Sequence, residues 1–306
     1  SNVDLDSPSV REPFLQALSK VAAHWSPAPL IQGTPQPGVP RALTNPANPT
    51  HIIGQVLEAE LVLVDKALTI AAKAQPEWAA TSALNRADIL DKTADLFEEN
   101  RTELVARIVL EAGRTIKNAL AEVREAVDLC RYYAAEARRQ LVEPQKLEAY
   151  TGERNHLSLH PRGIVVAISP WNFPLAIFAG QIAAALVTGN AVIAKPAEQT
   201  PAIGYRAVQL FHAAGVPPAV LADAHACLDA IDATLAPSTL DDEGFSRYVE
   251  LNARFHLLLS RMVGSDVVAR ELDRVKGLPF ASPSAFVVVQ THSAQARDML
   301  VVAQDQ

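Results

Sequence analysis

Two short apolar runs separated by a helix-like stretch constrain the fold of this chain most. The runs are residues 164–168 and 191–194, and residues 175–186 between them have an apolar, helical pattern. A further helical pattern follows and ends near Gly215. Neighbouring parallel strands need a crossover of about a dozen residues or more, and strand–helix–strand–helix order is typical of α/β folds. We therefore predict two parallel strands that end at the same edge of a sheet.

The chain on either side of this unit follows other patterns. Residues 1–50 contain a short helical pattern and then a proline-rich run, which predicts an extended arm. Residues 57–141 predict four helices, and residues 82–100 place apolar side chains at helical spacing behind Ser82, a favourable N-cap. After Leu221 only helical spacing continues. We expect an α/β unit followed by an all-α partial helical bundle.

Charge and hydropathy exclude several classes of protein. The net charge is −7, so the chain lacks the basic excess with which nucleic-acid-binding proteins neutralise phosphates. Polar residues interrupt the most apolar stretch, and no unbroken apolar run reaches the roughly 18 residues of a membrane span. Two cysteines, Cys130 and Cys227, cannot form a disulfide framework, and no secretory leader pattern opens the chain. We expect a cytoplasmic protein that binds a small-molecule substrate or effector, without nucleic acid or membrane.

A turn after the first predicted strand contains the first candidate site. Its sequence is Ser169-Pro170-Trp171-Asn172-Phe173-Pro174. Two prolines restrict the backbone around one amide side chain. Asn172 could donate a hydrogen bond to an oxygen that becomes negatively charged during a reaction. The alternative is that its side chain only caps the turn.

Lys195 and Glu198 follow the second predicted strand. They are expected at the same sheet edge as Asn172, where ligands bind in open α/β sheets. An ammonium group and a carboxylate at this spacing could hold the two hydroxyl groups of a ribose. A solvated surface pair, which contributes little energy, is the alternative.

Several segments, in their order along the chain, resemble the aldehyde dehydrogenase superfamily. They are the turn at residues 169–174, Pro161-Arg162-Gly163, Gly189-Asn190 and Ala194-Lys195-Pro196-Ala197-Glu198-Gln199-Thr200-Pro201. Three others are similar to the L-glutamate γ-semialdehyde (1-pyrroline-5-carboxylate) dehydrogenase module of bifunctional proline utilisation A: residues 121–128, Tyr132-Tyr133 and Glu111-Ala112-Gly113-Arg114-Thr115. The resemblance covers residues 1–221. Because a proline dehydrogenase module comes first in that family, a chain that begins at Ser1 is expected to be a truncated form.

The resemblance implies NAD-dependent oxidation of L-glutamate γ-semialdehyde to glutamate in proline catabolism. It implies that Asn172 forms the oxyanion hole and that Lys195 and Glu198 hold the adenosine ribose of NAD. Other cofactor-binding positions that it implies are Ile168, Ser169, Pro170 and Trp171. Phe173 matches an aromatic position near the aldehyde, although core packing is an equal alternative for both aromatic residues of the turn. Residues 51–221 are then expected to form a partial doubly wound NAD-binding domain.

The family's chemistry also needs a cysteine thiolate, a glutamate base and a glycine-containing loop under the pyrophosphate. None of these is recognisable after the matched region. Cys227 begins a predicted helix and Cys130 lies within one, so both are interpreted as small core residues rather than nucleophiles. We therefore expect this chain to be inactive in aldehyde oxidation.

Residues 222–306 resemble a different family, the FCD-type effector-binding domain of GntR-family transcription regulators. The similar segments are residues 248–256, residues 278–285 and Gly264-Ser265. This resemblance implies Asn252 and His256 as ligands of a divalent metal such as zinc, while a histidine satisfied at the edge of the core is the alternative. Two further hypotheses follow: a metal- and carboxylate-sensing module, or a non-functional chimera joined near Leu221. A homo-oligomer is one way to cover the strand edges of an incomplete sheet.

Overall fold

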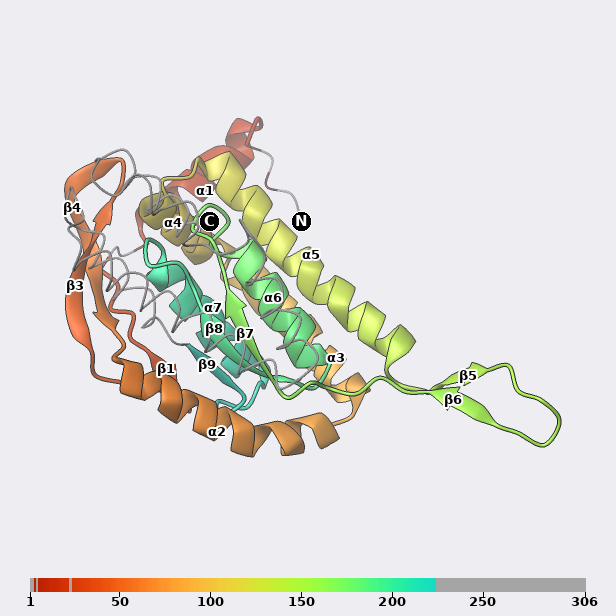
Figure 1. Ribbon diagram of the computed structural model, residues 1–306. Helices are drawn as coiled ribbons and strands as arrows, with labels where there is room; N and C mark the ends of the chain where they lie inside the picture. The colour runs from red at the N-terminus through yellow and green to blue at the C-terminus, as the bar shows by residue number, and fades with distance from the viewer. Residues whose placement is uncertain (1–2, 4, 22–23, 224–306) are drawn as a thin grey trace, which may run out of the picture. The chain divides into compact units, whose positions relative to one another are not determined.

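A computed structural model gives the fold of this chain and describes residues 3, 5–21 and 24–223. The chain divides into two units, Ser1–His225 and Ala226–Gln306. The elements below all belong to the first unit (Figure 1). Residues 224–306, with most of the expected all-α bundle, lie outside the described residues.

A three-stranded parallel sheet forms the centre of this unit. Its strands, in spatial order, are β7 (Ile164–Ile168), β8 (Ala191–Lys195) and β9 (Leu221–Asp223). β7 and β8 are the two predicted strands, and Ile168 pairs with Lys195 at their carboxyl ends. All residues of β8 are buried, as expected for a parallel strand between neighbours with helices on both faces. The predicted α/β class is confirmed.

The third strand corrects the sequence analysis. β9 pairs in parallel with β8, with Leu221 opposite Val192. Ala222 and Asp223 are therefore strand residues, and the all-α part cannot begin at residue 222. The pattern Leu-Ala-Asp is too short to be distinguished from a buried turn of helix by its periodicity.

Helices cover both faces of the sheet. The crossover helices α6 (Ala176–Val187) and α7 (Pro201–Ala214) connect consecutive parallel strands. Because such crossovers are almost always right-handed, both helices lie on one face. α2 (Leu61–Ala80) contacts all three strands and covers the other face (Figure 1). The indole N–H of Trp78 on α2 donates to the carbonyl oxygen of Leu186 at 3.0 Å, which ties α2 to the end of α6.

Three more helices pack outside α6 and α7, which confirms the predicted helical block. They are α3 (Ala83–Glu99), α4 (Arg101–Ala112) and α5 (Ile116–Gln140). Ser82 is the N-cap of α3, because its hydroxyl accepts a hydrogen bond from the N–H of Asn85 at 3.2 Å. Phe97 of α3 contacts Phe211 of α7 edge to face, with ring centroids 5.7 Å apart. The main core therefore lies between these helices and the sheet.

The N-terminal segment differs from the extended arm predicted for residues 1–50. It contains α1 (Pro8–Ser19), a small ribbon of β1 (Leu30–Ile31) with β2 (Thr34–Pro35), and a long antiparallel hairpin of β3 (Val39–Asn45) with β4 (Asn48–Glu58). The expected boundary at residue 50 thus falls inside β4. Pro40 fits β3 because its nitrogen faces the outer edge of the hairpin: the N–H of Leu57 opposite it donates away from β3, to the carbonyl oxygen of Pro27.

Close backbone contact fixes the hairpin against the chain before it. The N–H of Trp25 donates to the carbonyl oxygen of Ile53 at 3.0 Å, and the N–H of Gln55 donates to that of Trp25 at 2.9 Å. A Cβ atom at Gly54 would lie 2.1 Å from the Trp25 oxygen, so only glycine fits there. Ala202 of α7 belongs to the same buried cluster as Trp25 and Ile53, and this contact joins the hairpin to α7.

A second hairpin extends away from the sheet (Figure 1). Its strands are β5 (Gln145–Leu147) and β6 (Asn155–Leu157), and all six residues are exposed. In the described part of the chain, no helix is both long and apolar enough to cross a membrane.

Candidate functional site

The turn after β7 and the loop after β8 lie side by side at the carboxyl edge of the sheet. The N–H of Ser169 donates to the carbonyl oxygen of Lys195 at 3.2 Å, which continues the parallel ladder by one bond beyond the paired strands. The backbone therefore places the turn that carries Asn172 and the end of the strand that carries Lys195 at one sheet edge, as expected. Ligands in open α/β folds bind at this kind of edge.

Arg114, between α4 and α5, holds the turn that carries Asn172. Its Nη1 donates to the backbone carbonyl oxygen of Asn172 at 2.6 Å, and its guanidinium carbon lies 4.5 Å from the ring centroid of Phe173. The Asn172 residue is exposed, Phe173 is half-buried, and Trp171 is 43% exposed. Core packing therefore does not account for Trp171. Arg114 was in a motif of the sequence analysis, but no pattern there predicted its contact with the turn.

The hydroxyl of Ser169 is directed to a neighbouring side chain. Ser169 is buried, and its Oγ donates to Oε1 of Gln181 on α6 at 3.1 Å. Ile168 and Pro170 on either side of it are half-buried. These three expected cofactor-binding residues are thus buried or half-buried at the sheet edge, while Trp171 is exposed.

A buried carboxylate fixes the start of α6 just after this turn. Oε1 of Glu122 on α5 accepts hydrogen bonds from the N–H groups of Leu175 at 2.8 Å and Ala176 at 3.4 Å. Glu122 is 1% exposed, and this burial raises the pKa of its carboxyl group, although the two N–H donors oppose the shift. The contact stabilises the N-terminus of α6, where the helix dipole favours negative charge.

Lys195 and Glu198 border the same edge on the side of β8. Lys195 is only 8% exposed, so the alternative of a solvated surface pair does not describe it. The carboxylate of Glu198 is half-buried and accepts a hydrogen bond from the side-chain amide of Gln199 at 2.9 Å. The backbone carbonyl oxygen of Glu198 accepts from Nη2 of Arg41 at 2.8 Å.

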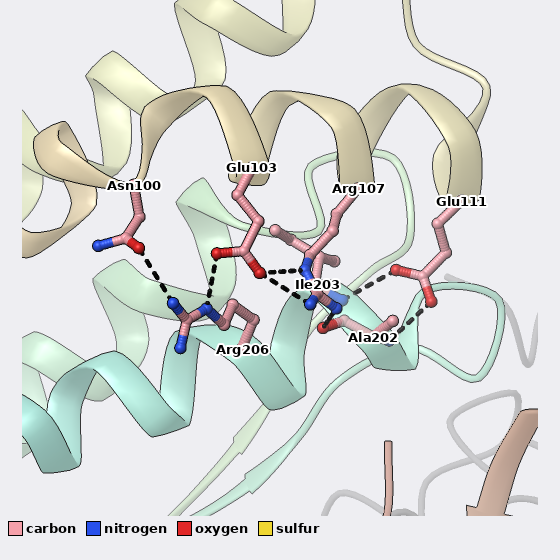
Figure 2. A network of polar contacts seen from close by, with 7 residues as sticks. All are labelled: Asn100, Glu103, Arg107, Glu111, Ala202, Ile203 and Arg206. Carbon is pink, nitrogen blue, oxygen red and sulfur yellow. Dashed lines mark hydrogen bonds and ion pairs between the residues drawn. The ribbon is translucent and has the colours of Figure 1, made fainter. Parts of the chain in front are cut away.

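A polar network joins α4 to the start of α7 (Figure 2). The two carboxylate oxygens of Glu111 accept from the N–H groups of Ala202 at 2.6 Å and Ile203 at 2.9 Å. One turn earlier, Arg107 donates to the carbonyl oxygen of Ala202 at 3.2 Å and pairs with Glu103 at 2.8 Å. α7 therefore begins on a buried carboxylate, as α6 does.

The same network continues along both helices, as Figure 2 shows. Glu103 also pairs with Arg206 of α7 at 3.0 Å, and Arg206 donates to Oδ1 of Asn100 at 3.0 Å. Arg107 lies 4.6 Å from the ring centroid of Trp25, and its burial lowers the pKa of its guanidinium group. Charged residues of α4 thus set the position of α7 relative to the N-terminal segment.

Cys130 is a core residue, as predicted. It is fully buried on α5, and this burial raises the pKa of its thiol to about 12, so it is not a thiolate near neutral pH. Cys227, Asn252 and His256 lie outside the described residues. Within residues 3, 5–21 and 24–223, no group of three or more His, Cys, Asp or Glu side chains could hold a metal ion.

Comparison with known proteins gives consistent results. The model of the aldehyde dehydrogenase family matches residues 36–226. The Bifunctional protein PutA of Klebsiella aerogenes is 45% identical over 204 residues, which are 67% of this chain and 15% of that protein. The 1-pyrroline-5-carboxylate dehydrogenase of Geobacillus sp. (strain WCH70) is 40% identical over 214 residues, which are 69% of this chain and 41% of that protein.

Solved structures agree with this result. The structure of 1-pyrroline-5-carboxylate dehydrogenase from Thermus with bound NAD matches with a TM-score of 0.71 and 31% identity, over 78% of this chain and 47% of that chain. This chain therefore spans less than half the length of each of these relatives. The resemblance of residues 222–306 to an effector-binding domain stays a prediction. The family match covers more than half of the sequence, and the chain belongs to the aldehyde dehydrogenase family.

Proposed function

We propose that this chain binds NAD at the carboxyl edge of its sheet and represents the cofactor-facing part of a dehydrogenase of proline catabolism. The substrate class we infer is L-glutamate γ-semialdehyde, the open form of 1-pyrroline-5-carboxylate. The observation that carries the proposal is the bond from Ser169 N–H to the Lys195 carbonyl, since it brings both candidate loops to one edge. Relatives named 1-pyrroline-5-carboxylate dehydrogenase and PutA support the substrate class.

The residues at this edge fit a dinucleotide. The ammonium group of Lys195 and the carboxylate of Glu198 have the donor and acceptor character that the hydroxyl groups of a ribose need. Trp171, in the turn after the neighbouring strand β7, is 43% exposed. When bound, NAD would supply the acceptor for a hydride from the aldehyde carbon. The Thermus relative is named with NAD bound, which supports this choice of cofactor.

On the substrate side, we propose that the side-chain amide of Asn172 donates to the aldehyde oxygen as negative charge develops on it. Arg114 fixes the backbone of this residue by donating to the Asn172 carbonyl oxygen, and the guanidinium group of Arg114 stacks on the ring of Phe173. Because the backbone of the turn is held, the amide is oriented in advance, which is the condition for effective stabilisation of such charge.

We also propose that the chain alone does not oxidise the aldehyde. The thiol of Cys130 is fully buried and its pKa is about 12, so it cannot attack a bound aldehyde. NADH formation from the semialdehyde should therefore be absent. Formation of NADH that is lost when either Cys130 or Cys227 is replaced by alanine would contradict this proposal.

Calorimetric titration of NAD into the full chain tests the cofactor site. We expect saturable binding that Lys195→Met and Glu198→Gln both weaken, together with a melting temperature that rises with NAD concentration. Arg138→Ala is the matched control, because Arg138 is a partly exposed arginine that pairs with Asp88 and Asp91 on the helical surface. Absence of binding by the wild-type chain, or equal weakening by the control, would refute the proposed site.

A further inference from the structure

The loop between β8 and α7 has fixed ends. At one end, Lys195 pairs with Ile168 at the last position of the parallel register. At the other end, Glu111 binds the first N–H groups of α7. Between these points the loop contains the turn in which the N–H of Thr200 donates to the carbonyl oxygen of Ala197 at 3.0 Å. Glu198 lies inside this turn, so the direction of its side chain depends on how the peptide groups of the turn are oriented.

One side chain from a distant part of the sequence reaches this turn. Nη2 of Arg41 on β3 donates to the carbonyl oxygen of Glu198 at 2.8 Å. Nε of the same guanidinium group pairs with Oε1 of Glu58 on β4. Arginine can hold two partners at once because its donors form a rigid, planar fork. The ion pair therefore orients the guanidinium group, and the guanidinium group in turn orients the Glu198 peptide.

The hairpin that carries Arg41 is itself fixed relative to α7. Leu43 and Val56 of the hairpin belong to the buried cluster that contains Ala202, and Trp25 in that cluster lies beneath Arg107. Arg41 thus connects the loop to a hairpin that packs on α7 through contacts of its own. The side chain of Arg41 is 41% exposed and that of Glu58 is 21% exposed, so their ion pair alone contributes little to stability.

We propose that Arg41 is a positioning residue for the nucleotide site, acting by fixing the Glu198 peptide so that the Glu198 carboxylate meets the ribose. This inference rests on the proposed function. It assigns to the N-terminal hairpin a role in cofactor affinity, which the sequence motifs alone do not indicate. Arg41 acts through the backbone of Glu198 rather than on the reacting atoms, and so it is not a catalytic residue.

Three variants of the full chain test the proposal, namely Arg41→Ala, Glu58→Gln and Arg138→Ala. NAD affinity is measured by calorimetry, and hydrogen exchange without NAD is measured for peptides covering residues 195–203. We expect Arg41→Ala to weaken NAD binding about tenfold, the change that corresponds to one lost charge-assisted hydrogen bond. It should also speed exchange in the loop. Glu58→Gln removes the charge but keeps an oxygen that accepts from Nε of Arg41, so the guanidinium group stays oriented and the effect on affinity should stay below about threefold.

The outcomes separate the inference from the proposed function. If Arg41→Ala and Glu58→Gln weaken NAD binding equally, the hairpin's stability rather than the loop contact explains the effect, and the inference is overturned. Affinity in Arg41→Ala within about twofold of wild type also overturns it. If the wild-type chain binds no NAD, the proposed function fails. In that case, faster hydrogen exchange of the loop in Arg41→Ala would still support the role of Arg41 in fixing the loop. Unchanged exchange would overturn that role as well.

Discussion

Replacing Glu111 by alanine should destabilise the folded chain by about 3 to 5 kcal/mol. The carboxylate is 4% exposed and accepts hydrogen bonds from the N–H groups of Ala202 and Ile203, which are themselves fully buried. A hydrogen bond to a charged group contributes about 1.5 to 3 kcal/mol, and both donors would stay buried without an acceptor. Arg107, also buried, would lose a nearby negative charge.

Urea unfolding of the full chain, followed by circular dichroism, measures this loss of free energy. Glu111→Gln keeps the shape and one carbonyl acceptor, so it should lose about half as much stability. Glu136→Ala is the matched control, because Glu136 is a partly exposed glutamate paired with the exposed Arg139, and its replacement should leave the unfolding midpoint unchanged. Unchanged slopes of free energy against urea concentration would show that stability, rather than compactness of the unfolded state, has changed.

A loss below about 1 kcal/mol in Glu111→Ala would refute this reasoning, because surface substitutions without structural consequence fall in that range. Equal losses in Glu111→Ala and the control would refute it too. Hydrogen exchange gives a second test, since the first amides of α7 should exchange faster in Glu111→Ala while those of α3 keep their protection.

Three further predictions concern single groups. Burial raises the pKa of Glu122 above the ordinary 4.5, so the stability of the wild-type chain should fall as the pH rises from about 4.5 through the pKa of the folded state. Urea unfolding of Glu122→Gln should not show this fall, and parallel pH profiles of the two chains would contradict the prediction. In a Cys227→Ser chain, the thiol of Cys130 should react with an aromatic disulfide reagent only as fast as the protein unfolds, and rapid labelling in the folded state would contradict its burial. The homo-oligomer stays a prediction. If exposed apolar side chains of the β5–β6 hairpin mediate it, Tyr150→Ser with Leu157→Ser should lower the sedimentation coefficient, and an unchanged value would exclude this hairpin as the interface.

The sequence predicted two kinds of element well. The helices α2 to α5 were predicted because their patterns repeat over many residues, and β7 and β8 because their short apolar runs lie on either side of a helical crossover. β9 has three residues and no such repeat. The β3–β4 hairpin was missed because its prolines were interpreted as an extended arm, although Pro40 lies in β3 with its nitrogen at the outer edge.

The candidate site was predictable only in part, for a different reason. Asn172, Lys195 and Glu198 were found because they follow two predicted strands that had to end at one edge. The residues that hold them in place come from elsewhere. Arg41 contacts a peptide 157 residues away, and Arg114 contacts one 58 residues away. No local pattern encodes such contacts, because they depend on how separate elements pack.

The two carboxylates that begin α6 and α7 also bear on how this chain folds during synthesis. Glu122 and Glu111 precede the N–H groups that they bind by 53 and 91 residues. On the ribosome, the helices α4 and α5 are therefore complete before either crossover helix has been made. Closing loops of this length costs entropy before the contacts repay it, so the assembly of the sheet should be slower than that of the helical block. The helical block can thus act as a preformed template on which each later helix starts in its final position.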